Sequence, residues 1–303
     1  MKKILIILSL AVLGACGFED IEVEYGVTSV YFYNQEYNRN IVVGEGLRLK
    51  VGSMLTGLIK NDKDRIVRYT INESLVTDPA KTVLPRSLYT VDNDEHFVIR
   101  KGEFIGFLGV EFDSAAFVND PKALTGEYVL PVEITGCDDV DSVNALKKHI
   151  LVSISYWAKQ HGNYYYSGQT IRKNAGVSVD TLTYAYDRTN ANSVRQLITV
   201  GPNTMEVIPD NAGSSSDPGK NLFSFNVSVP TLGGGEVTIA PSDNSAVVVT
   251  ANGSSSYDEA NRTFYLNYAY NDGLYDCFAT DTLVFRNRVR DVQADGQGVN
   301  EWR

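Results

Sequence analysis

Acidic side chains are the residues of this chain best suited to acid–base chemistry. They gather in three places: Asp92, Asp94 and Glu95; Asp113; and Asp138, Asp139 and Asp141. Glycoside hydrolysis needs two carboxylates that face each other across a cleft, one to protonate the leaving oxygen and one to act as base or nucleophile. Most of these residues fall in predicted turns, which favour Asp because its side chain bonds the nearby backbone. We therefore interpret them as solvated loop residues.

Other catalytic and metal-binding patterns are missing from the sequence. It contains no Gly-x-Ser-x-Gly elbow, no P-loop and no Gly-x-Gly-x-x-Gly fingerprint. His96, His149 and His161 are scattered, which does not suit zinc. The acidic run from Asp138 to Asp141 lacks the Gly and the distal Glu of an EF-hand calcium loop. The sequence therefore predicts a protein without enzyme activity, metal or cofactor.

Aromatic residues are the second group with a chemical use, since the chain has 18 Tyr and 2 Trp. A flat ring with a polar edge suits sugar binding, because its face covers the C–H patches of a sugar while nearby amides and carboxylates bond the hydroxyls. The residues predicted to lie on an outward face or in a loop are Tyr165, Tyr257, Tyr265 and Trp302. For any one tyrosine the alternative is that Tyr is a favoured strand residue. By face, the predicted core tyrosines are Tyr128, Tyr184, Tyr268 and Tyr270.

The N-terminus carries a thiol with a different chemistry. Lys2 and Lys3 precede an apolar run over residues 4–13, which is too short to span a bilayer comfortably and is typical of a signal peptide. The run ends in Leu13-Gly14-Ala15-Cys16, which resembles a bacterial lipobox, the signal whose cysteine is diacylated and becomes the first mature residue. Residues 1–16 are therefore predicted to be a lipoprotein signal peptide, with Cys16 as the lipid attachment site. A plain secretory signal with a chance cysteine is the alternative.

Charge limits what else the chain can bind. The formal net charge is −10, and it becomes about −12 once Lys2 and Lys3 leave with the signal. An acidic surface argues against binding to nucleic acid or directly to anionic lipid. We expect the membrane to be reached through several acyl chains on Cys16, which suffice for stable anchoring. Residues 17–26 are predicted to be an acidic tether, and acidic residues in this place resemble surface-export signals of Bacteroidetes lipoproteins.

The two other cysteines, Cys137 and Cys277, are predicted to lie in different domains. In an export compartment a disulfide could join them. Two separate buried thiols are the preferred interpretation.

Residues 27–158 alternate apolar and polar side chains with a period of two. Leu47, Leu49 and Val51, for example, alternate with Arg48 and Lys50. Short runs of this kind between turn signals predict an antiparallel β-sandwich. Pro131 cannot donate to a strand ladder, so its strand is predicted to be an edge or to bulge there. The one predicted helical turn spans Ser114–Val118.

Residues 159–303 form a second β-rich region by the same criterion. Its best-defined strands, 263–270 and 274–285, are joined by Asn271-Asp272-Gly273, whose Asp-Gly step suits a tight hairpin.

Two parts of the sequence resemble known domain families. The segment Tyr128-Val129-Leu130-Pro131-Val132-Glu133-Ile134 resembles the signature of an immunoglobulin-like domain of unknown function at the N-terminus of Bacteroidetes surface lipoproteins. The opening Gly162-Asn163-Tyr164-Tyr165-Tyr166-Ser167-Gly168 and the closing residues 298–303 resemble the lipocalin-like domain that often follows it. The resemblance implies an all-β chain, with a sandwich over 27–158 and a lipocalin-like β-barrel or half-barrel over 159–303. A second sandwich would give the same periodicity.

The same resemblance carries the expected function. The family is commonly encoded beside starch-utilisation-type uptake systems, which implies a non-catalytic glycan-binding accessory protein, lipid-anchored in the outer membrane at the cell surface. The implied partners are a polysaccharide or oligosaccharide and outer-membrane transporter components. The alternatives are, in order, a structural or adhesive surface protein and a glycoside hydrolase.

Overall fold

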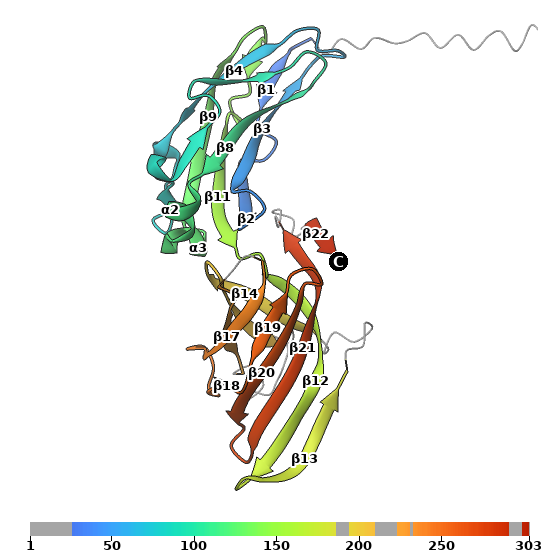
Figure 1. Cartoon of the computed structure of the whole chain (residues 1–303). Helices are drawn as coiled ribbons and strands as arrows, with labels where there is room; N and C mark the ends of the chain where they lie inside the picture. Colours follow the sequence, from blue (N-terminus) through green and yellow to red (C-terminus); the bar gives the residue numbers. More distant parts are fainter. Residues whose placement is uncertain (1–25, 186–193, 210–222, 231–232, 291–298, 303) are drawn as a thin grey trace, which may run out of the picture.

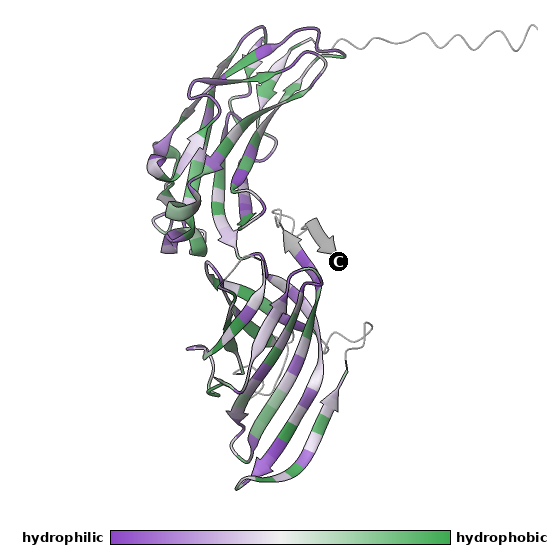
Figure 2. Cartoon of the chain, viewed as in Figure 1, coloured by the Kyte–Doolittle hydropathy of each residue, from purple (hydrophilic) through white to green (hydrophobic). Residues whose placement is uncertain are grey.

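The computed structural model describes residues 26–185, 194–209, 223–230, 233–290 and 299–302. Its regular structure is nearly all β, which confirms the predicted fold class. Two stacked sheets form the first part of the chain, and a large curled sheet forms the second (Figure 1). Apolar and polar residues alternate along many of the strands (Figure 2), as a sheet with one buried face requires.

The first part of the chain is the predicted sandwich. One sheet has five strands, in the order β10 (Ser142–Val143), β1 (Ser29–Tyr31), β3 (Arg48–Thr56), β8 (Ile105–Phe112) and β6 (Tyr89–Val91). The other has the order β2 (Glu36–Val42), β11 (His149–Trp157), β9 (Tyr128–Cys137), β4 (Arg65–Ile71) and β7 (His96–Ile99), with β5 (Thr82–Val83) beside β9. Most neighbours are antiparallel, as predicted, but β1–β10, β2–β11 and β5–β9 are parallel. β1 and β2 are consecutive in the chain yet lie in different sheets.

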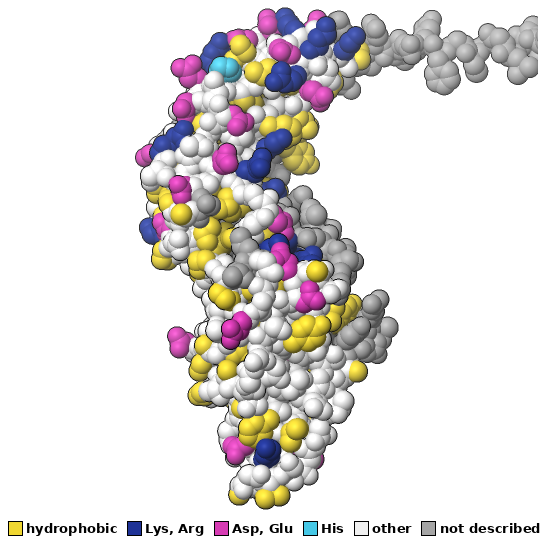
Figure 3. Space-filling view, viewed as in Figure 1, with side chains coloured by type: hydrophobic (Ala, Val, Ile, Leu, Met, Phe, Trp, Pro, Cys, Tyr) yellow, Lys and Arg dark blue, Asp and Glu magenta, His cyan; other side chains and the backbone are white. Residues whose placement is uncertain are grey.

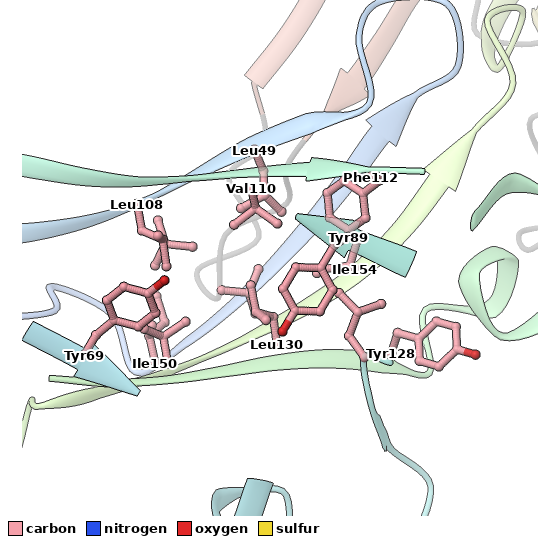
Figure 4. Close-up of a cluster of buried hydrophobic side chains, with 14 of the residues drawn as sticks. Leu49, Tyr69, Tyr89, Leu108, Val110, Phe112, Tyr128, Leu130, Ile150 and Ile154 are labelled. Atoms are coloured by element: carbon pink, nitrogen blue, oxygen red, sulfur yellow. The ribbon is translucent and has the colours of Figure 1, made fainter. Parts of the chain in front are cut away.

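The inward-pointing apolar side chains of both sheets fill the space between them. Figure 4 shows Leu49 and Leu108 of one sheet facing Leu130 and Ile150 of the other, and all four are buried. A buried tyrosine keeps its hydroxyl at the margin of this core: that of Tyr128 donates to Asp120 Oδ2 at 2.7 Å. Because the hydroxyl has a partner, the ring can be buried without leaving a polar atom unsatisfied.

Pro131 lies in an interior strand, and the register shift of β9 against β4 falls at Thr135, so neither the predicted edge nor the predicted bulge lies at Pro131. β9 pairs with β11 on one side. On its other side it pairs first with β5, at Tyr128 and Val129, and then with β4, from Val132 onward. Pro131 falls where β5 gives way to β4, and its carbonyl accepts from Asn72 just past the end of β4. No ladder bond is lost there, because neither β5 nor β4 has a residue paired with Pro131.

Short helical segments connect the strands. The 3₁₀ turns η1 (Glu73–Leu75) and η2 (Arg86–Leu88) precede β5 and β6, and helices α2 (Ser114–Val118) and α3 (Pro121–Thr125) link β8 to β9. Asp113 caps α2, which confirms the predicted helical turn. The sequence analysis did not predict α3, although Asp120 caps it and Pro121 occupies its first turn, where a missing N–H costs nothing.

The second part of the chain is an eleven-stranded sheet. Its strands are β12 (Gly162–Asn174), β13 (Val177–Tyr184), β14 (Val194–Gly201), β15 (Thr204–Pro209), β16 (Phe225–Ser228), β17 (Gly235–Pro241), β18 (Thr250–Ala251), β19 (Ser255–Asp258), β20 (Thr263–Asn271), β21 (Asp276–Arg290) and β22 (Val299–Trp302). β12 pairs with both β14 and β21, so the ladder β14-β15-β16-β17-β19-β20-β21-β12 closes on itself. This closed antiparallel path is a barrel, one of the two predicted forms, and not a second sandwich.

Side chains fill the interior of this barrel. The ring of Tyr164 meets those of Phe264 and Phe285 with centroids 5.6 and 5.5 Å apart, and all three are buried. Past the closed path, β12, β20 and β21 continue as a longer sheet with β13 at its side (Figure 1).

The sandwich and the barrel meet at a buried arginine. Arg288 of β21 is fully buried; its Nη1 donates to the carbonyl oxygen of Lys159 at 3.1 Å and its Nη2 to Glu45 Oε1 of the sandwich at 2.7 Å. Nearby, the ring of His161 stacks on Trp157 with centroids 4.0 Å apart. Burial, reinforced by Arg288, lowers the pKa of His161 to about 3. The neutral imidazole accepts a backbone N–H through Nδ1, so the junction is held by directed polar contacts.

Replacing Arg288 by Met should destabilise the chain, because Glu45 and the Lys159 carbonyl lose a buried donor. We expect a loss of about 2 kcal/mol in the free energy of unfolding, less than for a fully buried pair because the Glu45 side chain is 33% exposed. Urea unfolding followed by circular dichroism measures it. Lys63→Met, which breaks the half-exposed pair with Asp139, should change stability little. An equal loss in the free energy of unfolding of both variants would contradict a stabilising role for the Arg288 contacts at the junction.

Candidate functional site

Two of the four predicted aromatic residues lie on one outward face of the barrel. Tyr165 of β12 is opposite Val284 of β21, and Tyr265 of β20 is opposite Thr282 of the same strand. Their neighbours in sequence, Tyr164 and Phe264, are buried, so alternation turns the two tyrosines outward. The rings flank β21 and are separated by two strand spacings, about 10 Å across the sheet.

The two tyrosines differ in exposure. Tyr265 is 45% exposed. Tyr165 is half-buried, with the guanidinium carbon of Arg286 5.5 Å from its ring centroid. One ring is therefore open to solvent and the other is held in place beside a cation.

Apart from Val284, the surface between and beside these rings is polar. By register the outward positions belong to Ser167 and Gln169 of β12, Thr280 and Thr282 of β21, and Asn267 of β20. The Thr280 hydroxyl donates to Asn267 Oδ1 at 3.1 Å. Hydroxyl and amide groups beside aromatic rings are the combination that binds sugar hydroxyls.

Tyr257 is not part of this face, and its predicted outward position was wrong. It is 4% exposed, and its ring packs on Phe264 with centroids 4.4 Å apart. Its strand, β19, has only four residues, and Ser255, also buried, accepts the backbone N–H of Asn267. A serine buried through a hydrogen bond hides the apolar alternation that would have marked Tyr257 as inward.

The other predicted residues are only partly described. The backbone of Trp302 pairs with Asn287 of β21, and its side chain lies outside the described residues. Cys16 and residues 17–25 also lie outside them.

The inward face of the same strands carries a second tyrosine cluster, centred on Asp281. This carboxylate is 3% exposed and accepts from the hydroxyl of Tyr268, at 2.7 Å, and from that of Tyr184. Gly168 of β12 lies opposite it, and a Cβ there would stand 2.7 Å from Asp281 Oδ1. Glycine therefore makes room for the buried carboxylate. Tyr166 completes the group, with its ring 5.4 Å from that of Tyr184.

Sequence reasoning missed Asp281, although the sequence holds a signal for it. Between Cys277 and Phe285 the inward positions of β21 are otherwise apolar: Cys277, Ala279, Leu283 and Phe285. A carboxylate that interrupts such a series must find partners inside the fold.

Burial controls the charges of this cluster. It raises the pKa of Asp281, although the hydrogen bonds from Tyr184 and Tyr268 favour the carboxylate. Burial and the nearby carboxylate raise the pKa of both tyrosines, so the phenols stay protonated and donate. The cluster ties β13, β20 and β21 together through one acceptor.

Two grooves lie in the sandwich. One, of about 510 Å³, is lined by aromatic, apolar and cationic residues of β2, β3, β8 and β11 and of the segment before β2. The other, of about 460 Å³, includes Asp92 and Glu103 among its lining residues. The sequence analysis predicted neither groove.

Metal-binding clusters and membrane-spanning helices are absent from the described part of the chain. There, no group of three His, Cys, Asp or Glu side chains could hold a metal ion. Cys137 and Cys277 are unbridged thiols in β9 and β21. None of the helices in the described ranges is both long and apolar enough to cross a bilayer.

Comparison with known proteins relates the chain to Bacteroides proteins. Residues 20–141 match the model of a family of N-terminal domains. A protein of unknown function from Bacteroides ovatus has a similar crystal structure, with 22% identity and a TM-score of 0.67 over 86% of this chain and 95% of that chain. This likeness shows a shared fold. The predicted relation to Bacteroides proteins of unknown function is confirmed at that level.

More distant likenesses add little. An auxiliary nutrient binding protein from Bacteroides thetaiotaomicron is 14% identical, with a TM-score of 0.44 over 85% of this chain and 92% of that chain. Such a likeness is too loose to support an argument about function. No curated protein matches the chain significantly.

The raised pKa of Asp281 gives a pH dependence with a definite sign. Ionising this carboxyl costs more in the folded chain than in the unfolded one, so its contribution to stability is greatest below the ordinary carboxyl pKa of about 3.9. That contribution falls as pH rises through the raised pKa. The free energy of unfolding of the wild type, measured against Asp281→Asn in urea, should therefore fall as the pH rises above about 4.

The exposed Asp243 supplies a control for this titration. Asp243→Asn should follow the wild type at every pH. A difference between wild type and Asp281→Asn that stays constant or grows with pH would contradict the burial of the charge.

Proposed function

We propose that this chain is a non-catalytic glycan-binding lipoprotein at the surface of a Bacteroidetes cell. The observation that supports binding is the placement of Tyr165 and Tyr265 on one outward face, on either side of β21, with Thr282 and Val284 of that strand between them. Aromatic faces cover the apolar patches of a sugar, and the hydroxyl and amide groups of the same face bond its polar edge.

The proposed anchor is a set of acyl chains on Cys16, followed by the acidic tether of residues 17–26. The described chain begins at the end of the sandwich that lies away from the barrel (Figure 1). The sandwich then acts as a spacer, and the barrel presents its tyrosines away from the membrane. A shallow face binds a single sugar weakly, but many copies crowded on one surface raise the effective concentration of sites. An outer-membrane transporter component of a glycan uptake system is the proposed partner.

One observation favours a second function, adhesion to another protein chain. β13 pairs only with β12 among the described strands, and Val177, Val179 and Leu182 along it are 70%, 50% and 46% exposed. Leu274 of the adjoining β20–β21 hairpin is 78% exposed. Exposed apolar residues on an edge strand, whose outer side has no partner strand, form a place where another chain can add. Adhesion through this edge would be insensitive to changes at Tyr165 and Tyr265.

Alanine substitutions at the two tyrosines test the glycan face. The mature chain is screened on an array of plant and host glycans, and its affinity for a bound polysaccharide is measured by calorimetry. Tyr265→Ala and Tyr165→Ala should each weaken binding by about fivefold to tenfold, the equivalent of losing roughly 1 kcal/mol of ring contact. Ile59→Ala, at an exposed apolar residue of the sandwich that lines neither of its grooves, should bind as the wild type does. Flat isotherms across the array would end the proposal.

Metabolic labelling tests the anchor. Cells that express the chain and are grown with an alkynyl palmitate should attach this label to the chain. The chain should also fractionate with membranes. Cys16→Ala should carry no label and should leave the membrane with its circular dichroism unchanged. Cys137→Ala, which removes a thiol of the sandwich, should keep both the label and the membrane association. Unlabelled wild-type protein would contradict lipid anchoring.

A further inference from the structure

The 510 Å³ groove of the sandwich runs along the edge of one strand. Leu49 and Val51, which point into the core, and Lys50 and Gly52, which point out, all line it. Successive side chains of a strand point to opposite faces of the sheet. One groove can collect both sets only where it passes around the strand's edge.

That edge of β3 has no partner strand over part of its length. β8 covers the other side of β3 from Arg48 to Met54, whereas β1 covers this side only from Met54 to Thr56. No other described strand pairs with β3. The edge therefore lies open from Met54 back toward Arg48.

The backbone groups of this edge can be assigned from the hydrogen bonds at either end of β3. The N–H of Phe112 donates to the carbonyl of Leu47, and that of Leu55 donates to the carbonyl of Phe104. Antiparallel ladders alternate, so the odd-numbered residues between 47 and 55 exchange their bonds with β8. The N–H and C=O groups of Lys50 and Gly52 then point to the open edge.

The groove is cationic on an acidic protein. Arg39, Arg48 and Lys50 line it, and none of the described lining residues carries a carboxylate. Lys147 adds a further cation beside the groove, with its Nζ 5.9 Å from the ring of Tyr33. In Figure 3, hydrophobic and Lys or Arg side chains lie next to each other over the sandwich where β3 runs. Against a net charge of −10, such a cluster attracts anionic groups locally.

Phe107 supplies an aromatic wall. Its ring is 48% exposed and lies close against Gly52, where a Cβ would stand 3.0 Å from Phe107 Cε1. The Nζ of Lys50 lies 5.6 Å from the centroid of the same ring. On the inner side, Ile150 and Val152 of β11 complete an apolar floor.

We propose that this groove binds an extended acidic peptide, which adds to the sheet as a strand beside β3 and in line with β1. The peptide backbone pairs with Lys50 and Gly52. Alternate side chains then enter the apolar floor, while acidic ones face Arg48 and Lys50. Strand addition of this kind takes affinity from main-chain bonds and specificity from the alternate pockets.

The open backbone edge is what favours a peptide over an acidic glycan, which has no ladder to offer. We assign the peptide to a separate partner protein. Ser29 pairs with Thr56 and Tyr31 with Met54, so the described chain enters β1 from the side of Thr56, away from Lys50. The proposal does not depend on the tyrosine face of the barrel.

A fluorescent peptide with the sequence of residues 18–25, Phe-Glu-Asp-Ile-Glu-Val-Glu-Tyr, has the required chemistry because acidic and apolar residues alternate at its end. Anisotropy titrations with the mature chain should show saturable binding that weakens as salt is added. A peptide of the same composition with its four acidic residues grouped before its four apolar ones should bind at least about fivefold more weakly, because alternation is lost.

Variants of Lys50 separate charge from strand pairing. Lys50→Gln removes the charge and should weaken binding about fivefold. Lys50→Pro also removes the N–H at the open edge and should abolish measurable binding; proline is tolerated on the free side of an edge strand. Lys60→Gln, at an exposed lysine outside the groove, should change nothing. Near-UV circular dichroism checks that each variant is folded, and Arg48→Gln with Lys50→Gln replaces the proline variant if that one is not.

Three results would overturn the proposal. One is the absence of binding by the alternating peptide. Another is binding that the Lys50 variants leave intact. The third is equal binding by the alternating and grouped peptides, which would reduce the groove to a nonspecific anion site. An oligogalacturonate that binds with the same Lys50 dependence while the peptide does not would assign the groove to an acidic glycan.

Discussion

The pairing between β12 and β21 is the constraint on which the second half of the molecule depends. It runs in register from Tyr164 opposite Phe285 to Lys173 opposite Asp276, and it closes the barrel. A slip of one residue would exchange the two faces of β12. Tyr165 would then enter the core and Tyr164 would face solvent. The register therefore determines both which tyrosines of these strands are buried and which face solvent.

β21 extends this control to the rest of the chain. Its outward Thr282 lies between the exposed tyrosines, and its inward Asp281 gathers the phenols of β13 and β20. Farther along, Arg288 of the same strand reaches the sandwich. A change in the position of this one strand would disturb the polar face, the buried carboxylate and the junction together. Asp281 and Arg288, two of the buried charged side chains of the described residues, are thus positioned by the same strand.

Much of the fold was predictable because it depends on local patterns. Period-two alternation located the strands, and the Asp-Gly step located the turn between β20 and β21, where Asp272 Oδ1 accepts from the backbone N–H of Leu274 and Tyr275. Alternation also predicted correctly that Tyr165 and Tyr265 face outward. The outward prediction for Tyr257 was wrong because its short strand also buries a serine, which hides the alternation of apolar and polar residues.

Other features depend on which strands meet, and a single sequence does not contain that information. Pro131 is tolerated inside a sheet because β5 and β4 share one side of β9 and neither pairs with Pro131. The groove exists because β1 leaves β3 after Tyr31 and the next strand joins the other sheet, parallel to β11. Asp281 gave a visible signal, a charge in an apolar series, but its partners come from strands far apart in the chain.

One register sorts the tyrosines into a buried set and an outward set, and the outward set is the one proposed to bind glycan. Fluorine NMR of the mature chain labelled with 3-fluorotyrosine tests it directly, with resonances assigned by Tyr→Phe substitution. Addition of a polysaccharide that the chain binds should shift the resonances of Tyr165 and Tyr265 together and leave those of Tyr257 and Tyr268 in place. Shifts confined to other tyrosines, with Tyr165 and Tyr265 unmoved by a bound polysaccharide, would contradict the account.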